Sequence, residues 1–195
     1  MNYKGAEEYI IGKLRDELPE NLYYHGLQHT LNVMEAASRY GTMENLGGEE
    51  MILLKTAALY HDSGYLIEYS NNESKSVKIV QDVLPAFGYT QNQIVQICEM
   101  ICSTEVPQKP KNLTEKILCD ADLDYLGRDD FYIKGICLLR EWNEHGITTS
   151  LKEWYVQELH FLRQHKYYTK SAIKLRHKRK MFHLKQVEEL LGGND

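Results

Sequence analysis

The sequence predicts an all-α globular protein built from about eight helices. Apolar residues recur three and four positions apart along most of the 195 residues, which is the period of an amphipathic helix. The alternation typical of half-buried strands is absent, and the sequence contains no Asn-Gly or Asp-Gly pair that would favour a tight hairpin turn. The expected helices are too irregular for an up-and-down bundle.

Turn-forming residues set the ends of the first expected helices, because proline and glycine interrupt the helical hydrogen-bond pattern. The apolar stripe of the second helix, for example, consists of Val33, Ala36, Ala37 and Tyr40. The expected ranges are about 9–18 before Pro19, 25–40 before Gly41, 49–61 before Ser63-Gly64, and 73–84 before Pro85.

The later helices are read in the same way. One opens at Thr90 with a glutamine three residues on, which is capping-box spacing and satisfies free N–H groups of the first turn. The expected ranges are about 90–101, 114–126 before Gly127, 129–144, and a last third of one or two long helices at 150–163 and 171–191 that ends at Gly192-Gly193.

The composition is that of one globular domain, which we take as residues 1–195. Hydrophobic residues make up 43% and charged residues 26%, and these proportions exclude wholesale disorder. The longest apolar runs, such as residues 51–54, fall far short of the roughly 18 residues that span a bilayer. The N-terminal residues lack the basic and apolar regions of a secretory signal, so we expect a cytoplasmic protein without a membrane partner.

The four cysteines lie within apolar helical patterns, and none forms a Cys-x-x-Cys pair: Cys98, Cys102, Cys119 and Cys137. We therefore expect reduced thiols in the core of a cytosolic protein. A zinc site at Cys98 and Cys102 is the alternative, but the sequence offers no second ligand pair at zinc-site spacing.

The net charge of −5 makes nucleic acid an unlikely general partner, but the charge is unevenly distributed. Residues 159–187 contain no acid and several basic side chains, within a helical extension of about 150–191. Arg176 and Lys180 are four residues apart, and Lys170 and Lys174 repeat that spacing, which predicts a cationic helix face. That face either lies over a cleft and holds substrate phosphates, or is solvated, or complements the acidic body. An RNA-binding stripe is a weaker alternative, since no RNA-module motif is present.

Three separated pieces place histidines and acids in patterns that suit a metal ion. His25 and His29 are four residues apart, so both imidazoles lie on one face of a helix that starts at or before His25. His61-Asp62 ends an apolar helix, where both side chains can reach one point. The third piece, residues 120–124, carries aspartates among apolar positions, where acids are costly unless paired or metal-bound.

Each piece alone has a simpler interpretation, namely an ordinary histidine pair, a chance dipeptide or a solvated helix end. The run Asp120-x-Asp122-x-Asp124 also resembles the start of an EF-hand loop, but Tyr125 and Phe131 stand where the loop needs Gly and Glu. One divalent ion accounts for all three pieces together, because imidazoles and carboxylates are ligands of such ions.

In this order and local context, the pieces resemble the His…His-Asp…Asp signature of the HD-domain superfamily of metal-dependent phosphohydrolases. The resemblance covers about residues 20–130 and implies a single HD-type helical domain. It implies that the metal ligands are His29, His61, Asp62 and Asp122.

The segment Tyr24-His25-x-x-x-His29 is most similar to the cyclic-nucleotide phosphodiesterase branch of that superfamily. This similarity implies that His25 is the general acid. The residues around Asp122 also resemble the distal-aspartate segment of this branch, which favours Asp122 over its two neighbouring aspartates. Glu73 falls near a position where many members carry a supporting acid.

The sequence departs from parts of the superfamily in one respect. No histidine occurs between Asp62 and Asp122, where two-metal hydrolases and di-iron oxygenases place further histidines. An oxygenase is therefore disfavoured, as is a fully ligated second ion, although Asp62 and waters can still hold a second Mg²⁺. The phosphodiesterase catalytic domain is much longer than this chain, so specificity for cyclic nucleotides is not implied.

The resemblance implies a phosphomonoesterase or phosphodiesterase acting on a nucleotide-like phosphate ester. A metal-activated water is the expected nucleophile, with Asp62 as proton acceptor and His25 as general acid. Mn²⁺, Mg²⁺, Ni²⁺, Zn²⁺ and Fe²⁺ all fit the expected ligands. The alternative is a non-catalytic HD-fold module that binds a nucleotide or a metal.

Overall fold

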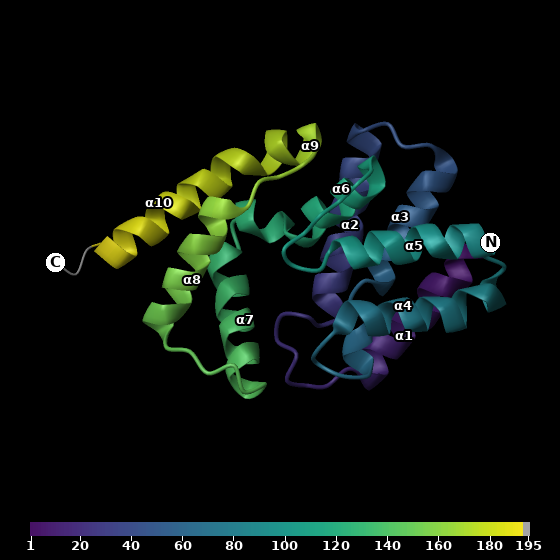
Figure 1. The fold of residues 1–195 in the computed structure, drawn as a ribbon, viewed down its shortest axis with the longest axis horizontal. Coiled ribbons are helices and arrows are strands. Elements are labelled where there is room, and N and C mark those ends of the chain that lie inside the picture. The colour runs from purple at the N-terminus through teal and green to yellow at the C-terminus, as the bar shows by residue number, and fades with distance from the viewer. Residues whose placement is uncertain (193–195) are drawn as a thin grey trace.

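A computed structural model describes residues 1–192, and every regular element in that range is helical, which confirms the all-α class (Figure 1). The helices are α1 (Tyr3–Glu17), α2 (Leu27–Met43), α3 (Gly48–Tyr60), α4 (Asn72–Val83), α5 (Gln91–Ser103), α6 (Leu113–Asp122), α7 (Phe131–Glu144), α8 (Leu151–Gln164), α9 (Lys170–Ala172) and α10 (Lys178–Gly192). The connecting turns are η1 (Ser63–Leu66), η2 (Leu84–Phe87) and η3 (Asp124–Gly127), which are 3-10 helical, and η4 (Ile173–His177), which is π-helical. The expected stop at Gly192-Gly193 reaches beyond the described residues.

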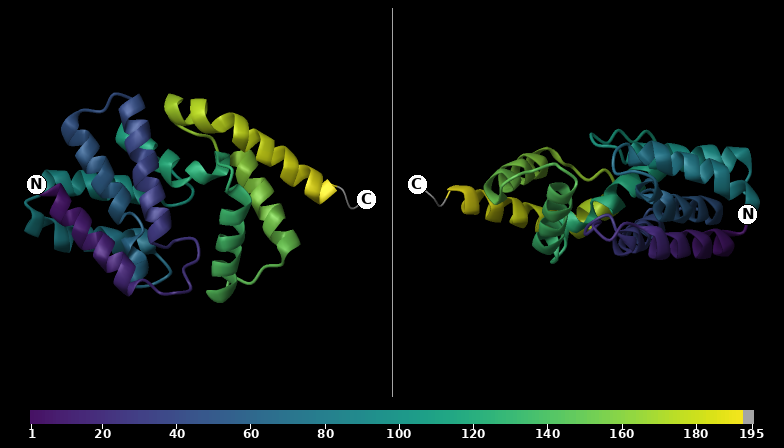
Figure 2. Two further views of the ribbon diagram at one scale, coloured as in Figure 1. Left: turned by 180° about the vertical axis from the view of Figure 1, so that it is seen from behind. Right: turned by 90° about the horizontal axis from the view of Figure 1, so that it is seen from below.

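Two apolar cores lie side by side along the long axis of the molecule (Figures 1 and 2). Helices α1 to α6 surround the larger core, whose largest buried side chains include Tyr40, Leu54, Tyr60 and Ile101. Helices α7, α8 and α10 surround the smaller core, which is built on Leu126, Phe131, Leu162 and Val187. The C-terminal extension therefore packs with η3 and α7 to form a second apolar core. That residues 1–195 form one domain stays a prediction.

The capping box at the start of α5 is confirmed. The Thr90 side chain accepts a hydrogen bond from the Gln93 N–H at 3.4 Å, and the Gln93 side chain accepts one from the Thr90 N–H at 2.9 Å. None of the helices within residues 1–192 is both long enough and apolar enough to cross a bilayer.

Helix α2 differs from its expected range at both ends. It begins at Leu27, because Gly26 has an extended backbone conformation, so His25 lies in the preceding loop and does not share a helix face with His29. Gly41 does not stop the helix, which continues to Met43. A Cβ at Gly41 would lie 2.7 Å from Met51 Cε and 3.2 Å from a Leu54 methyl, so this glycine allows α2 and α3 to pack closely.

The acidic run does not continue as one helix, because α6 ends at Asp122 and Asp124 lies in η3. Asp124 is buried and pairs with the C-terminal extension. Arg176 donates hydrogen bonds to its two oxygens at 2.7 and 3.0 Å. Tyr40 and Arg39 also donate to this carboxylate, so Asp124 links α2 to the turn η4.

Asp120 forms a second link to the C-terminal extension. Its fully buried carboxylate accepts hydrogen bonds from the backbone N–H groups of Tyr168 and Thr169, both at 2.8 Å, and from the Thr169 hydroxyl at 2.6 Å. The same hydroxyl accepts the Ala172 N–H and caps α9. Asp120 therefore fixes the point where the chain returns to the larger core.

The expected cationic face is wrong at Arg176 and Lys180, because both side chains turn inward, whereas Lys170 and Lys174 are exposed as expected. Arg176 pairs with Asp124, and the buried Lys180 donates to the His165 carbonyl. Farther along, Arg179 pairs with Asp129 at 2.7 Å. Of the alternatives for this basic segment, these contacts support the one in which it complements the acidic body.

The expectation of four core thiols is correct in part. Cys98 and Cys119 are buried, whereas Cys137 is half-buried and Cys102 is exposed, since it lies on the outer face of α5. All four are free thiols. Among the described residues, no group of metal-ligating side chains forms around Cys98 and Cys102.

Gly127 marks a close approach between η3 and η4, because a Cβ there would lie 2.5 Å from the Arg176 carbonyl oxygen. We expect Gly127→Ala to lower the free energy of unfolding by about 1–3 kcal/mol through overpacking, as measured by urea denaturation. Gly12→Ala is the control, since nothing lies within 4 Å of a Cβ in that part of α1 and alanine is the better helix former. Native stability in Gly127→Ala would contradict the packing described.

Candidate metal centre

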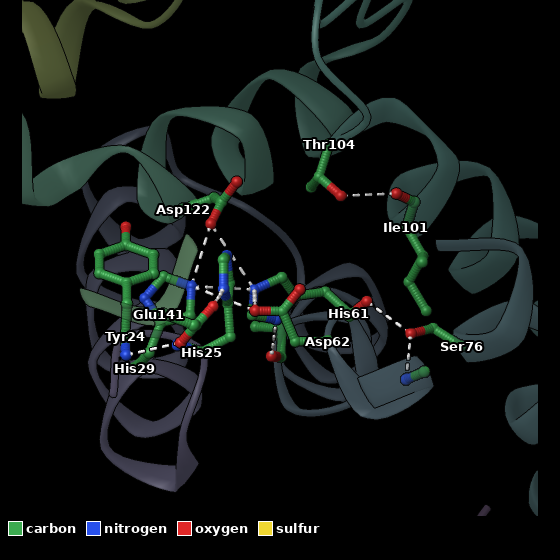
Figure 3. Close-up of polar contacts among 12 residues, drawn as sticks. Tyr24, His25, His29, His61, Asp62, Ser76, Ile101, Thr104, Asp122 and Glu141 are labelled. Carbon is green, nitrogen blue, oxygen red and sulfur yellow. Dashed lines mark hydrogen bonds and ion pairs between the residues drawn. The ribbon is translucent and has the colours of Figure 1, made fainter. Parts of the chain in front are cut away.

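Four side chains from separate segments meet at one largely buried point (Figure 3). His29 comes from α2, His61 and Asp62 follow α3, and Asp122 is the last residue of α6. His61 Nε2 lies 3.3 Å from His29 Nε2, 3.1 Å from Asp62 Oδ2 and 3.6 Å from Asp122 Oδ1. His29 Nε2 lies 3.4 Å from Asp62 Oδ2 and 3.2 Å from Asp122 Oδ1. We call these four residues the His/Asp cluster.

The donor atoms of the His/Asp cluster fit a divalent cation. His61 Nδ1 donates to the Ala58 carbonyl at 2.8 Å, which leaves the Nε2 lone pair facing the cluster. Asp62 Oδ2 is buried and makes no hydrogen bond with any described residue, and such an oxygen is costly without a compensating charge. His29, His61 and Asp122 each offer one ligand atom, and these three atoms lie within 4.8 Å of one another. Together with Asp62 they could hold one ion.

The charges of the cluster favour a positive ion at this point. Burial opposes ionisation of Asp122, but hydrogen bonds from His29 and His61 outweigh it and lower its pKa. At His61 burial would lower the pKa, but the charges of Asp62 and Asp122 outweigh burial and raise it well above the usual value. Burial lowers the pKa of His29, which keeps its imidazole in the neutral form that binds metals.

Helix α4 holds the backbone that carries His61 and Asp62. The Ser76 hydroxyl donates to the His61 carbonyl at 2.7 Å and accepts the Gly64 N–H at 2.8 Å. Gly64 must be a glycine, because a Cβ there would overlap the carbonyl of Asn72 at the start of α4. The segment after α3 is therefore clamped against α4 with the two side chains turned toward the cluster.

His25 lies beside the cluster and is positioned by Glu141 from α7. Its Nδ1–H donates to Glu141 Oε1, and Glu141 Oε2 accepts the backbone N–H groups of Tyr24 at 2.8 Å and His25 at 3.1 Å. Glu141 is completely buried, and the His25 ring stacks on Tyr65 with 4.6 Å between ring centroids. These contacts occupy Nδ1 and leave Nε2 as the free nitrogen of the ring.

The pKa of His25 is raised above its usual value. Burial lowers the pKa, but the hydrogen bond to Glu141 and the negative charge of Asp62 outweigh burial. The imidazolium form is therefore stabilised, and a larger fraction of His25 carries a proton at neutral pH than in an exposed histidine.

A cavity of about 810 Å³ separates the cluster from α7 and α8. His25, Asp62 and Asp122 line the side next to the cluster, together with Glu73, which the sequence placed near the ligands. The opposite side belongs to α7 and α8, whose contribution includes Trp142. A volume of this size is typical of a small-molecule site, for which about 300–1,000 Å³ is usual.

The structure brings together all five candidate residues of the sequence analysis: His25, His29, His61, Asp62 and Asp122. Asp120 and Asp124, the rejected neighbours of Asp122, point to the C-terminal extension instead. Sequence reasoning missed Glu141, Ser76 and the α7–α8 side of the cavity. Glu141 follows His25 by 116 residues, and nothing in its local sequence separates it from a surface acid.

A model of the HD domain matches residues 26–124, which is just over half of the chain. The chain belongs to the HD domain family. The match includes the four residues of the His/Asp cluster and ends before α7, so Glu141 and the α7–α8 side of the cavity lie outside it. No curated protein sequence matches the chain.

Solved structures with the same HD-type fold include proteins from several bacteria. A predicted HD superfamily hydrolase from an uncultured Thermotogales bacterium is 21% identical, with a TM-score of 0.64 over 95% of this chain and 91% of that one. Bacillus subtilis YpgQ in complex with ADP is 19% identical, with a TM-score of 0.68 over 97% of this chain and 95% of that one. A Lactobacillus plantarum protein is 16% identical, with a TM-score of 0.71 over 97% and 94%. At these identities the likeness shows the fold.

Replacing Glu141 by glutamine removes the charge that supports the His25 imidazolium. Because the hydrogen bond to Glu141 raises the pKa of His25, we expect Glu141→Gln to lower that pKa, measured by NMR titration of the histidine rings. Glu144→Gln is the control, since Glu144 lies on the same helix but bonds Tyr23 and Arg140 instead. An unchanged His25 titration in Glu141→Gln would show that the carboxylate does not act on this ring.

Proposed function

We propose that the protein is a metal-dependent phosphohydrolase that cleaves a nucleotide-like phosphate ester. The observation that carries the proposal is the convergence of His29, His61, Asp62 and Asp122 at the wall of a cavity, with His25 beside them but outside the cluster. A site that only binds a metal has no use for a separately positioned histidine with a raised pKa. That histidine favours hydrolysis over a non-catalytic binding module.

The proposed roles follow from the positions of the side chains. His29, His61, Asp62 and Asp122 hold the divalent ion. A bound ion supplies a coordinated water of lowered pKa, about 7 in favourable sites, and offsets negative charge on phosphoryl oxygens. Asp62 accepts the proton of the attacking water. His25 donates the proton on Nε2 to the leaving oxygen as the phosphorus–oxygen bond breaks, while Glu141 keeps its ring oriented.

The nucleotide-like character of the substrate has two supports. The cavity beside the cluster is large enough for a small ligand of this kind. In addition, YpgQ, which shares the fold over nearly its whole length, has been crystallised with ADP. Whether the ester is a monoester or a diester remains part of the proposal to be measured.

Metal analysis followed by an activity screen tests the proposal as a whole. The purified chain is loaded in turn with Mn²⁺, Mg²⁺, Ni²⁺, Zn²⁺ or Fe²⁺ and assayed against mononucleotides, cyclic nucleotides and a generic phosphodiester. Turnover with at least one ion is expected, and the ion-to-chain ratio shows whether Asp62 also supports a second Mg²⁺. Tight nucleotide binding without turnover under any ion would establish the binding module instead.

Removing a cluster residue should remove the ion and the activity together. We expect His61→Ala and the nearly isosteric Asp122→Asn to lose bound metal, measured by elemental analysis, and to lose turnover. His177→Ala is the control, because His177 lies in the turn η4 and takes no part in the cluster or the cavity. A folded His61→Ala chain that keeps a full complement of metal would refute the ligand assignment.

Removing His25 should separate chemistry from metal binding. We expect His25→Ala to keep its metal but to turn over about 10²–10⁴ times more slowly, since that is the usual contribution of a general acid. The loss should be largest for esters with poor leaving groups, which depend most on protonation. Equal losses for good and poor leaving groups would exclude a general-acid role.

A further inference from the structure

The charges around the cavity divide it into two parts. Carboxylates of Asp62, Asp122, Glu73 and Glu105 line the part next to the cluster, and none of the described lysines or arginines lines the cavity at all. A phosphate group therefore has no lysine or arginine to pair with, and it belongs at the cation beside His25. The far side of the cavity is left for an uncharged portion of the substrate.

The far side of the cavity is mainly aromatic, with Glu158 and His160 as its titratable side chains. Trp142 from α7 and Trp154 and Phe161 from α8 line it, and the two indole rings meet edge to face with 5.1 Å between centroids. Tyr125 continues this surface toward the cluster. Such a wall suits a planar ring, because aromatic stacking tolerates any flat π-system.

Two buried polar atoms in this wall have no partner. The indole Nε1 of Trp154 and Oε1 of Glu158 make no hydrogen bond within the described residues, although the two side chains are only 4% and 7% exposed. Burial raises the pKa of Glu158 to about 7, and the neighbouring Trp154 side chain offsets that rise only in part. Both residues line the cavity, and Glu158 packs against Gly135, where a Cβ would lie 3.1 Å from Oε1. Unpaired buried groups of this kind point to a ligand that satisfies them.

We propose that the α7–α8 wall binds the nucleobase of the substrate, with the Glu158 carboxyl, which the neighbouring Trp154 positions, accepting a hydrogen bond from an exocyclic amino group. The inference rests on the proposed function, because it assigns the base end of the same nucleotide. It predicts a preference for adenine, cytosine or guanine over uracil. Uracil carries a carbonyl where cytosine carries its exocyclic amino group, and that oxygen would face the Glu158 carboxylate and be repelled by it.

Intrinsic fluorescence tests this site without any turnover. The chain has only two tryptophans, and both line the proposed base site, so quenching reports ligands bound there. Adenosine, cytidine, uridine and ribose 5-phosphate are titrated into the full chain in the absence of added metal. We expect adenosine and cytidine to bind about 10-fold more tightly than uridine, and ribose 5-phosphate to cause no quenching.

Two variants test Glu158 and the positioning Trp154 separately. Glu158→Gln should weaken adenosine binding about 10-fold and reduce the preference over uridine, and Trp154→Phe, read through Trp142, should weaken binding while keeping the ring. Glu189→Gln is the control, since Glu189 is an exposed acid of α10 outside the cavity, and it should bind as the native chain does. Circular dichroism confirms that each variant is folded.

The outcomes separate this inference from the proposed function. Equal quenching by adenosine and uridine, or an unchanged preference in both Glu158→Gln and Trp154→Phe, would overturn the base site even if phosphate esters are hydrolysed. Selective quenching by amino-bearing nucleosides that is lost in these variants would support the base site even if no ester is turned over.

Discussion

The structure depends on placing two imidazoles 3.3 Å from each other and each within 3.1–3.6 Å of two carboxylates, in a largely buried position. Such a cluster is unfavourable unless the surrounding chain holds it rigidly and a positive charge compensates it. The surrounding helices provide the rigidity. Ser76 clamps the backbone of His61, Gly41 of α2 permits close packing with α3, and the end of α6 presents Asp122. The helices of the larger core are thus arranged around the His/Asp cluster, which is the most polar point within it.

The C-terminal helices take part in the site as well as in the fold. The alternating aspartates connect the two parts of the molecule. Asp122 points to the histidines of the cluster, whereas Asp120 bonds Thr169 and Asp124 bonds Arg176 in the C-terminal extension. That connection sets α7 and α8 across the cavity from the cluster, and Glu141 of α7 reaches back to hold His25. The HD match ends before these helices, so the α7–α8 side of the cavity lies outside the matched family region.

Much of the fold could be predicted from the sequence because its signals are local. The helical period, the capping box at Thr90 and the proline and glycine positions act within a few residues. The grouping of His29, His61, Asp62 and Asp122 came from a spaced pattern shared with the family. The position of His25 outside α2 depends on the backbone of Gly26, and the inward turn of Arg176 depends on a partner 52 residues away. No local sequence pattern identifies Glu141, Trp154 or Glu158 as site residues, because each reaches the site only through the packing of helices that are distant in sequence.

The π-helical turn η4 has a consequence for the helix that follows it. Each residue of a helix rotates the next by about 100°, so the turn fixes which side of α10 faces inward. With the present length, Lys180, His183 and Val187 are buried. Shortening the turn by one residue would rotate these three by about 100° away from the core and put Met181, Leu184 and Glu188 in their places. We therefore expect η4 to tolerate a change of side chain better than a change of length. Insertions and deletions in residues 173–177 should accordingly be rarer than substitutions.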